Sequence, residues 1–205
     1  MRIEFARMPV VSNPIPEAVF FFVVLSWIAF MLVFFIWRKP AKAKETKRDN
    51  ASRWGMLLQS FAFFVTWLIA RQYFTPIVPM PKALEFVVAV LTIALAASSV
   101  WICATAARTL GKQWTYVARV VEGHKLITEG PYRWVRNPIY TGMLGMMLAT
   151  NLAVSRWWAV PIALVFFLAG NQIRIRTEEK LLREAFGAEF EDYARRVPAI
   201  LPRFF

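Results

Sequence analysis

The sequence predicts an all-α integral membrane protein with five transmembrane helices, for three reasons. Of its 205 residues, 58% are hydrophobic and 19% are charged, whereas an average soluble domain has about 45–50% and about 25%. Two stretches without a charged residue, 18–37 and 86–107, are long enough to cross a bilayer core of about 30 Å at about 1.5 Å per residue. The basic residues also alternate between the segments that join the apolar stretches. These observations exclude an ordinary soluble domain and a disordered chain.

Five apolar segments account for the predicted spans: 18–37, 54–70, 86–107, 138–155 and 157–173. The first is too long for the apolar region of a signal peptide and lacks a small-residue cleavage site, so we expect a retained anchor. The last two are separated only by Arg156 and its neighbours, which predicts a tight antiparallel hairpin. In the fourth span, Gly142 and Gly145 allow close packing of a neighbouring helix.

The lysines and arginines support this count. Twenty of them lie in the segments 38–53 and 108–137 and after residue 173, and the other side of the membrane receives five. The positive-inside rule then predicts an N-terminus outside and a C-terminus in the cytoplasm. The net charge of +12 is explained by this orientation and by attraction to anionic lipid headgroups.

Several functional classes are excluded by the residues present. No basic segment is interleaved with stacking aromatic residues, so we expect no nucleic-acid partner. The single cysteine, Cys103, cannot form an internal disulfide, and one cysteine with one histidine cannot build a zinc cluster. No glycine-rich motif follows a strand, which excludes a soluble Rossmann-type enzyme.

The polar segment 123–142 has features that a structural loop would also show. Gly130-Pro131 is a turn signal. Asn137-Pro138 is typical of the N-cap and first residue of a helix, and the exposed N–H groups at such a helix start favour an anion. From these features alone, a structural loop and a functional site are both open interpretations.

The segment 177–202 predicts a C-terminal cytoplasmic amphipathic helix on the membrane or on the bundle. Thr177 is a candidate for its cap, and Glu178 and Glu179 would then stabilise the dipole of its first turn. One apolar face repeats at steps of 4, 4, 3 and 4 residues: Leu182, Phe186, Phe190, Tyr193 and Val197.

Several motifs of the C-terminal half occur in a fixed order: His124-x-Leu126, Gly130-Pro131-Tyr132, Arg136-x-Pro138-x-Tyr140-x-Gly142, Glu178-Glu179-x-Leu181, Phe186-Gly187 and Tyr193. Together they resemble the isoprenylcysteine carboxyl methyltransferase family, within the wider group of membrane phospholipid methyltransferases. The resemblance covers about residues 108–202. The N-terminal spans match only in character. We therefore expect two parts: residues 1–107, with three spans and the basic cytoplasmic loop 38–53, and a methyltransferase-like catalytic half, 108–205. Five spans resemble the short prokaryotic members, which implies a prokaryotic inner membrane.

The resemblance further implies S-adenosylmethionine as the methyl donor and a cytoplasmic site without a metal. Arg136, Glu179 and Tyr140 are the implied catalytic residues. At position 137 the family usually has histidine, and Asn137 can therefore change the substrate or the rate. The implied donor-binding residues are His124, Lys125, Leu126, Gly130, Pro131, Tyr132, Arg136, Asn137, Pro138, Tyr140, Glu178 and Glu179.

These residue types suit the donor chemically. Glu178 or Glu179 can accept hydrogen bonds from ribose hydroxyls or from an ammonium group. Arg136 can pair with the donor carboxylate. Tyr132 and Tyr140 can offer an aromatic face to the sulfonium cation, an attraction of about 0.5–2 kcal/mol.

The expected acceptor is lipophilic and enters from the lipid, because the site adjoins the spans. A carboxylate of an isoprenylcysteine-like substrate is already ionised and needs no general base, in keeping with the absence of an obvious nucleophile–base pair. A phospholipid amine is the second candidate acceptor, with His124 or a glutamate as base.

Two different classes of protein remain open from the sequence. One is an NADPH-dependent membrane sterol-type reductase, which usually has more than five spans. The second is a non-catalytic scaffold or small transporter. Intramembrane charges, which a transporter usually has, are almost absent here, so the sequence favours the methyltransferase.

Overall fold

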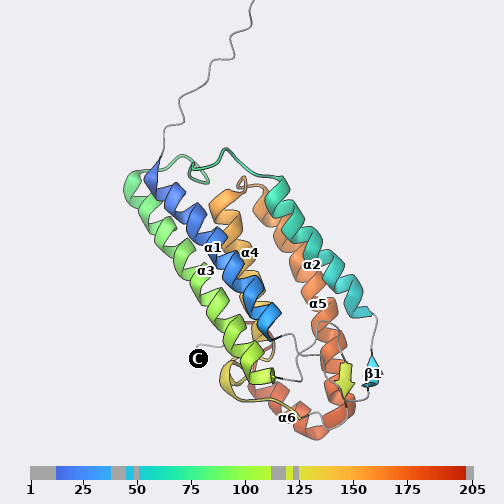
Figure 1. Cartoon of the computed structure of the whole chain (residues 1–205). Coiled ribbons are helices and arrows are strands. Elements are labelled where there is room, and N and C mark those ends of the chain that lie inside the picture. The colour runs from blue at the N-terminus through green and yellow to red at the C-terminus, as the bar shows by residue number, and fades with distance from the viewer. Residues whose placement is uncertain (1–12, 38–44, 49–50, 112–118, 122–124, 202–205) are drawn as a thin grey trace, which may run out of the picture.

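The computed structural model describes residues 13–37, 45–48, 51–111, 119–121 and 125–201. Its long helices form one bundle, with the shorter elements at one end (Figure 1). In chain order, the elements are α1 Pro14–Ile36, β1 Glu45–Arg48, α2 Ala51–Leu68, α3 Lys82–Leu110, β2 Arg119–Val121, the short 3-10 helix η2 Gly130–Arg133, α4 Pro138–Val154, α5 Ala159–Phe186 and α6 Ala188–Arg196.

Each predicted span corresponds to a helix, and three of these helices are long and apolar enough to cross a membrane: α1, α3 and α5. The fourth span is the shorter apolar helix α4, with 17 residues. The second is α2, with 18 residues. The helical membrane-protein prediction is therefore confirmed, and five crossings stay a prediction.

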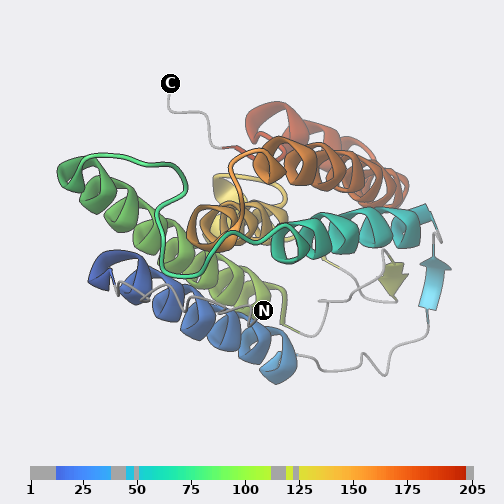
Figure 2. The same ribbon diagram turned by 90° about the horizontal axis from the view of Figure 1, so that it is seen from above.

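The helix α4 lies at the centre of the bundle, between the α1–α3 pair and the α2–α5 pair (Figure 2). One apolar core joins α1, α3 and α4 around Val23, Ala96 and Ala149. A second joins α2, α4 and α5 around Met147 and Phe167. Although the turn between α4 and α5 is short, α5 packs mainly on α2 rather than on α4.

Glycines allow these pairs to approach closely. A β-carbon on Gly142 would lie 2.9 Å from the carbonyl oxygen of Ser99, and one on Gly145 would collide with the same serine's hydroxyl. The predicted packing role of both glycines is therefore confirmed, against α3. Between α2 and α5, a β-carbon on Gly170 would lie 2.6 Å from the carbonyl oxygen of Gly55.

The two ends of the bundle differ in character. One end carries the start of α1, the segment 69–81 and the α4–α5 turn, while the other carries β1, β2, η2 and α6 (Figure 1). At the first end Arg71 donates hydrogen bonds to the carbonyl oxygens of Leu152, Ala153 and Ser155 at 2.6–2.9 Å. It thereby satisfies carbonyls that the end of α4 leaves unpaired. Burial lowers the pKa of Arg71 to about 10, so it remains a cation at neutral pH.

Two sequence-based expectations need correction. The predicted C-terminal helix does not begin at Thr177, because α5 continues to Phe186 and the Thr177 hydroxyl bonds the carbonyl of Ile173 inside it. The predicted single apolar face is broken at Gly187, where φ is +53° and α6 begins in a new direction. The all-α fold class is confirmed, and the strands among the described residues are the short antiparallel pair β1 and β2.

Candidate functional site

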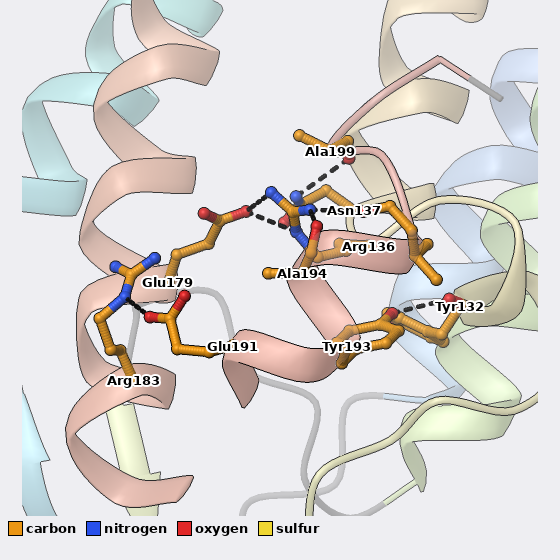
Figure 3. Close-up of polar contacts among 10 residues, drawn as sticks. Tyr132, Arg136, Asn137, Glu179, Arg183, Glu191, Tyr193, Ala194 and Ala199 are labelled. Atoms are coloured by element: carbon orange, nitrogen blue, oxygen red, sulfur yellow. Dashed lines mark hydrogen bonds and ion pairs between the residues drawn. The ribbon is translucent and has the colours of Figure 1, made fainter. Parts of the chain in front are cut away.

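Arg136 and Glu179 form the centre of the candidate site, at the end of the bundle that carries α6 (Figure 3). The guanidinium Nε and Nη2 of Arg136 lie 2.9 and 2.8 Å from Glu179 Oε1. Both side chains are largely covered, with 14% and 15% exposure. Arg136 Nη1 also donates to the carbonyl oxygens of Ala194, at 2.8 Å, and of Val197. The arginine thus ties the loop before α4 to α5, to α6 and to the residue that follows α6.

The segment that follows α6 fixes the loop before α4. The backbone N–H groups of Arg136 and Asn137 donate to the carbonyls of Pro198 and Ala199 at 2.8 and 3.0 Å. Thr141, in the first turn of α4, donates its hydroxyl to the carbonyl of Ile200 at 2.6 Å. These bonds hold the start of α4 and so orient Arg136.

The tyrosines Tyr132 and Tyr193 join η2 to α6. The hydroxyl of Tyr193 donates to the carbonyl oxygen of Tyr132 at 2.6 Å, and both side chains are buried (Figure 3). Burial raises the pKa of Tyr193 to about 12 and that of Tyr132 well above its ordinary value. Both phenols therefore stay protonated and neutral at physiological pH.

A second polar cluster lies beside the first and contains Tyr140, Arg174 and Glu178. The hydroxyl of Tyr140 bonds Glu178 Oε1. Arg174 Nη2 lies 3.7 Å from the same oxygen, and its guanidinium carbon lies 4.9 Å from the centroid of the Tyr140 ring, within cation–π range. The adjacent glutamates thus have different partners: Glu179 pairs with Arg136, and Glu178 with Tyr140 and Arg174.

Sequence reasoning missed three members of this second cluster: Gln59, Asn171 and Arg174. Gln59 Oε1 accepts a hydrogen bond from Arg174 Nη1 at 3.3 Å, and Gln59 Nε2 donates to Asn171 Oδ1. All three are buried. The four-residue spacing of Arg174 and Glu178 is a helical signal, but it would have been found only if α5 had been extended past residue 173.

The remaining predicted donor-binding residues differ in burial. Pro131 and Pro138 are buried beside Tyr132 and Tyr140. Gly130 is exposed and begins η2 with a φ of +58°. In the segment that precedes η2, Lys125 is exposed and Leu126 is half-buried. His124 lies outside the described residues.

The predicted N-cap role of Asn137 is only half right. Asn137 does occupy the N-cap position of α4, and Pro138 the first helical position. Its side-chain amide, however, donates to the carbonyl of Ala199 at 3.0 Å. In this structure Asn137 therefore anchors the segment after α6 rather than capping a helix N–H.

Within the described residues, no group of three or more His, Cys, Asp or Glu side chains could hold a metal. A hollow of about 330 Å³, which includes space open to solvent, lies at the opposite end of the bundle between α1, α3 and the segment 71–80. It contains Arg71 and Glu85 but none of the predicted site residues.

A model of the family described as phospholipid methyltransferase matches residues 87–189. These 103 residues are just over half of the 205-residue chain. The chain belongs to the phospholipid methyltransferase family. The match includes Arg136, Tyr140, Glu178 and Glu179, whereas Gln59 of the second cluster lies outside it.

Two curated relatives are similar to part of this chain. The chain is 38% identical over 97 residues to the probable protein-S-isoprenylcysteine O-methyltransferase of Oryza sativa subsp. indica, covering 46% of this chain and 50% of the relative. It is 40% identical over 103 residues to the cobalt-zinc-cadmium resistance protein CzcN of Cupriavidus metallidurans, covering 46% and 44%. The chain spans about half the length of the curated relatives it matches.

One solved structure has the same fold as this chain. The eukaryotic intramembrane Ras methyltransferase ICMT (isoprenylcysteine carboxyl methyltransferase) aligns with a TM-score of 0.58 and 19% identity, covering 94% of this chain and 69% of that chain. Together with the relatives, this alignment confirms the resemblance that the motifs indicated.

Proposed function

We propose that this protein is an S-adenosylmethionine-dependent methyltransferase that acts on a lipophilic acceptor at the cytoplasmic face of a prokaryotic inner membrane. The Arg136–Glu179 pair carries the proposal. It joins the two motifs of the family match, which are 43 positions apart, in a largely covered site of opposite charges. An arginine and a carboxylate together suit the carboxylate and ammonium groups of a zwitterionic donor.

The polar side chains at this end fit the donor by their chemistry. Arg136 would pair with the donor carboxylate, and Glu179 would accept hydrogen bonds from its ammonium group or ribose hydroxyls. Because the two side chains now bond each other, the donor would exchange one ion pair for two. Tyr140 and Glu178 lie closer than the Arg136–Glu179 pair to the membrane-spanning parts of α4 and α5.

When bound, the donor would supply an electrophilic methyl group, and the acceptor nucleophile would have to be held in line with the bond from that methyl group to sulfur. The residues of the chain contribute position and exclusion of water, which can account for about 7–11 kcal/mol of a barrier. A carboxylate acceptor arrives ionised, so no side chain has to remove a proton. The carboxylate oxygen forms the new bond to carbon, and the carbon–sulfur electron pair stays on sulfur.

The proposed topology has five crossings with the site in the cytoplasm. Its support is the arrangement of the ends: β1, β2, η2 and α6 all lie at one end (Figure 1), and each of these elements carries basic residues, such as Arg48, Arg119 and Arg133. Large apolar side chains are exposed along α1, α2 and α3, such as Phe35, Leu68 and Leu91. A lipid environment would cover these surfaces.

Among lipophilic acceptors, an isoprenylcysteine-like carboxylate is the first candidate, because several relatives are named protein-S-isoprenylcysteine O-methyltransferases. A phospholipid amine is the second, favoured by the description of the matched family. Incubation of the protein with labelled donor and each acceptor in lipid vesicles separates the two. Label that mild base releases as volatile methanol indicates a methyl ester and supports the first candidate, and label that stays non-volatile on the headgroup nitrogen supports the second.

Calorimetry with S-adenosylhomocysteine tests the donor site. The detergent-solubilised protein should bind it and should not bind NADPH. Arg136→Ala and Glu179→Gln should each lose binding while circular dichroism shows an unchanged helix content. Arg183→Ala and Glu191→Gln are matched controls, because they break an ion pair between α5 and α6 that is 48% and 46% exposed. Wild-type affinity in both Arg136 and Glu179 variants would remove the donor from this location.

A further inference from the structure

We propose that Gln59, on α2, is a positioning residue for the candidate site. It holds Arg174, and through Arg174 it orients the carboxylate of Glu178 and the ring of Tyr140. This inference rests on the proposed function in so far as it concerns donor binding. Gln59 lies outside the family match of residues 87–189. The N-terminal half would therefore contribute a residue to the site that the matched region does not contain.

The position of Gln59 requires an explanation. It stands in the middle of the apolar helix α2, yet its side chain is 2% exposed and faces α5. A buried amide inside a membrane-spanning bundle is unfavourable unless its polar atoms are bonded. Both ends of the Gln59 amide are used, one by Arg174 and the other by Asn171.

Contacts within α5 would not by themselves fix the orientation of the Arg174 side chain. It precedes Glu178 by four positions on α5, and this order of charges is the weaker one on an isolated helix. The ion pair is also long, at 3.7 Å. The guanidinium also contacts the Gln59 oxygen, at 3.3 Å, and the Tyr140 ring, at 4.9 Å. The contact from α2 therefore sets the direction in which the cation faces Glu178.

Close packing of α2 and α5 makes this contact reachable. A β-carbon on Gly170 would lie 3.0 Å from Gln59 Cγ, and one on Gly55 would collide with Cγ of Arg174. The glycine pair therefore brings the backbone of α2 to the stem of Arg174. This arrangement couples the separation of the two helices to the orientation of the Glu178 carboxylate.

The amide of Asn171 makes Gln59→Glu a conservative variant. Its Nδ2 is buried without a hydrogen-bond partner among the described residues. After Gln59→Glu, rotation of that amide by half a turn would let Nδ2 donate to one oxygen of the new carboxylate, while Arg174 bonds the other. Gln59→Glu should therefore retain the orientation of Arg174, and Gln59→Leu should lose it.

A double-mutant cycle tests the positioning without any ligand. Thermal unfolding of Gln59→Leu, Glu178→Gln and the double variant should give shifts that do not add, because both residues act on Arg174. Thr66→Val is the matched control. It removes another buried interhelical hydrogen bond of α2, to Asn151 at 3.1 Å, and should add to Glu178→Gln. Additive shifts for Gln59 would overturn the proposal. Gln59→Met replaces Gln59→Leu if the latter does not purify in a folded form.

Calorimetry then tests the consequence for the site. Gln59→Leu should weaken S-adenosylhomocysteine binding about tenfold. This is the size of effect expected when one hydrogen bond to a charged group is lost, here the bond from Arg174 to Gln59. Gln59→Glu should stay within about threefold of wild type, and Thr66→Val should be unchanged. If Arg136→Ala loses binding but Gln59→Leu does not, the positioning role is wrong and the proposed function stands. If the wild-type protein binds no S-adenosylhomocysteine, the proposed function fails, and the cycle still decides the role of Gln59.

Discussion

Arg136 and Glu179 meet through two nitrogen–oxygen contacts of 2.9 and 2.8 Å, although one precedes α4 and the other lies in the last third of α5. The pair is largely covered, and Arg136 is bonded to two further carbonyl oxygens. One guanidinium therefore connects three segments of the chain, and its replacement should affect both stability and the site.

Arg136→Lys should destabilise the protein by about 1–3 kcal/mol, because an ammonium group cannot reproduce the planar set of hydrogen bonds and leaves buried acceptors unpaired. Thermal unfolding in detergent measures the loss. Arg183→Lys, in the exposed pair with Glu191, should change the stability by less than about 0.5 kcal/mol. Equal effects at the two positions would contradict a special role for the Arg136 pair.

Tyr193→Phe should cost about 1–3 kcal/mol, because the buried carbonyl of Tyr132 loses its donor. The folded-state pKa of about 12 lies above the unfolded value of about 10. The contribution of this phenol is therefore complete below about pH 10 and is lost as the pH rises through about 12. The wild-type protein should lose stability across this interval more steeply than Tyr193→Phe does. Tyr73→Phe, at an exposed position, should leave the wild-type profile unchanged.

Gly187→Ala should destabilise the junction of α5 and α6 by about 1–3 kcal/mol, because φ there is +53° with ψ near −121°, a conformation that a β-carbon disfavours. Thermal unfolding again provides the measurement. Gly111→Ala has the same φ at the end of α3 and open space around it, so it should cost a similar amount. Wild-type melting of both variants would exclude strain at these helix ends.

Arg71→Met should destabilise the protein by about 2–3 kcal/mol, because three carbonyls at the end of α4 lose their donors. Affinity for S-adenosylhomocysteine should not change, since Arg71 lies at the end of the bundle opposite the candidate site. Arg156→Met, at an exposed position of the α4–α5 turn at the same end of the bundle, serves as the control. Loss of S-adenosylhomocysteine binding in a folded Arg71→Met variant would show that the two ends of the bundle are coupled.

The sequence by itself determined the membrane class, the approximate place of each long helix and the residues of the family motifs. The physical reason is that these features are local: apolar length decides whether a helix can cross a bilayer, and motif spacing is visible without a fold. The sequence predicted that Arg136 and Glu179 share a pocket, but it did not predict the direct ion pair between them.

Tertiary structure decided the rest. Whether Glu178 or Glu179 faces Arg136 depends on the rotation of α5 about its axis, which packing on α2 fixes and local pattern does not. The same packing brings Gln59 to Arg174 from a distant part of the chain. The end of α5 also depended on Gly187, because apolar periodicity continues through a change of helix direction. Contacts between segments, unlike helix formation, depend on the whole arrangement of the bundle.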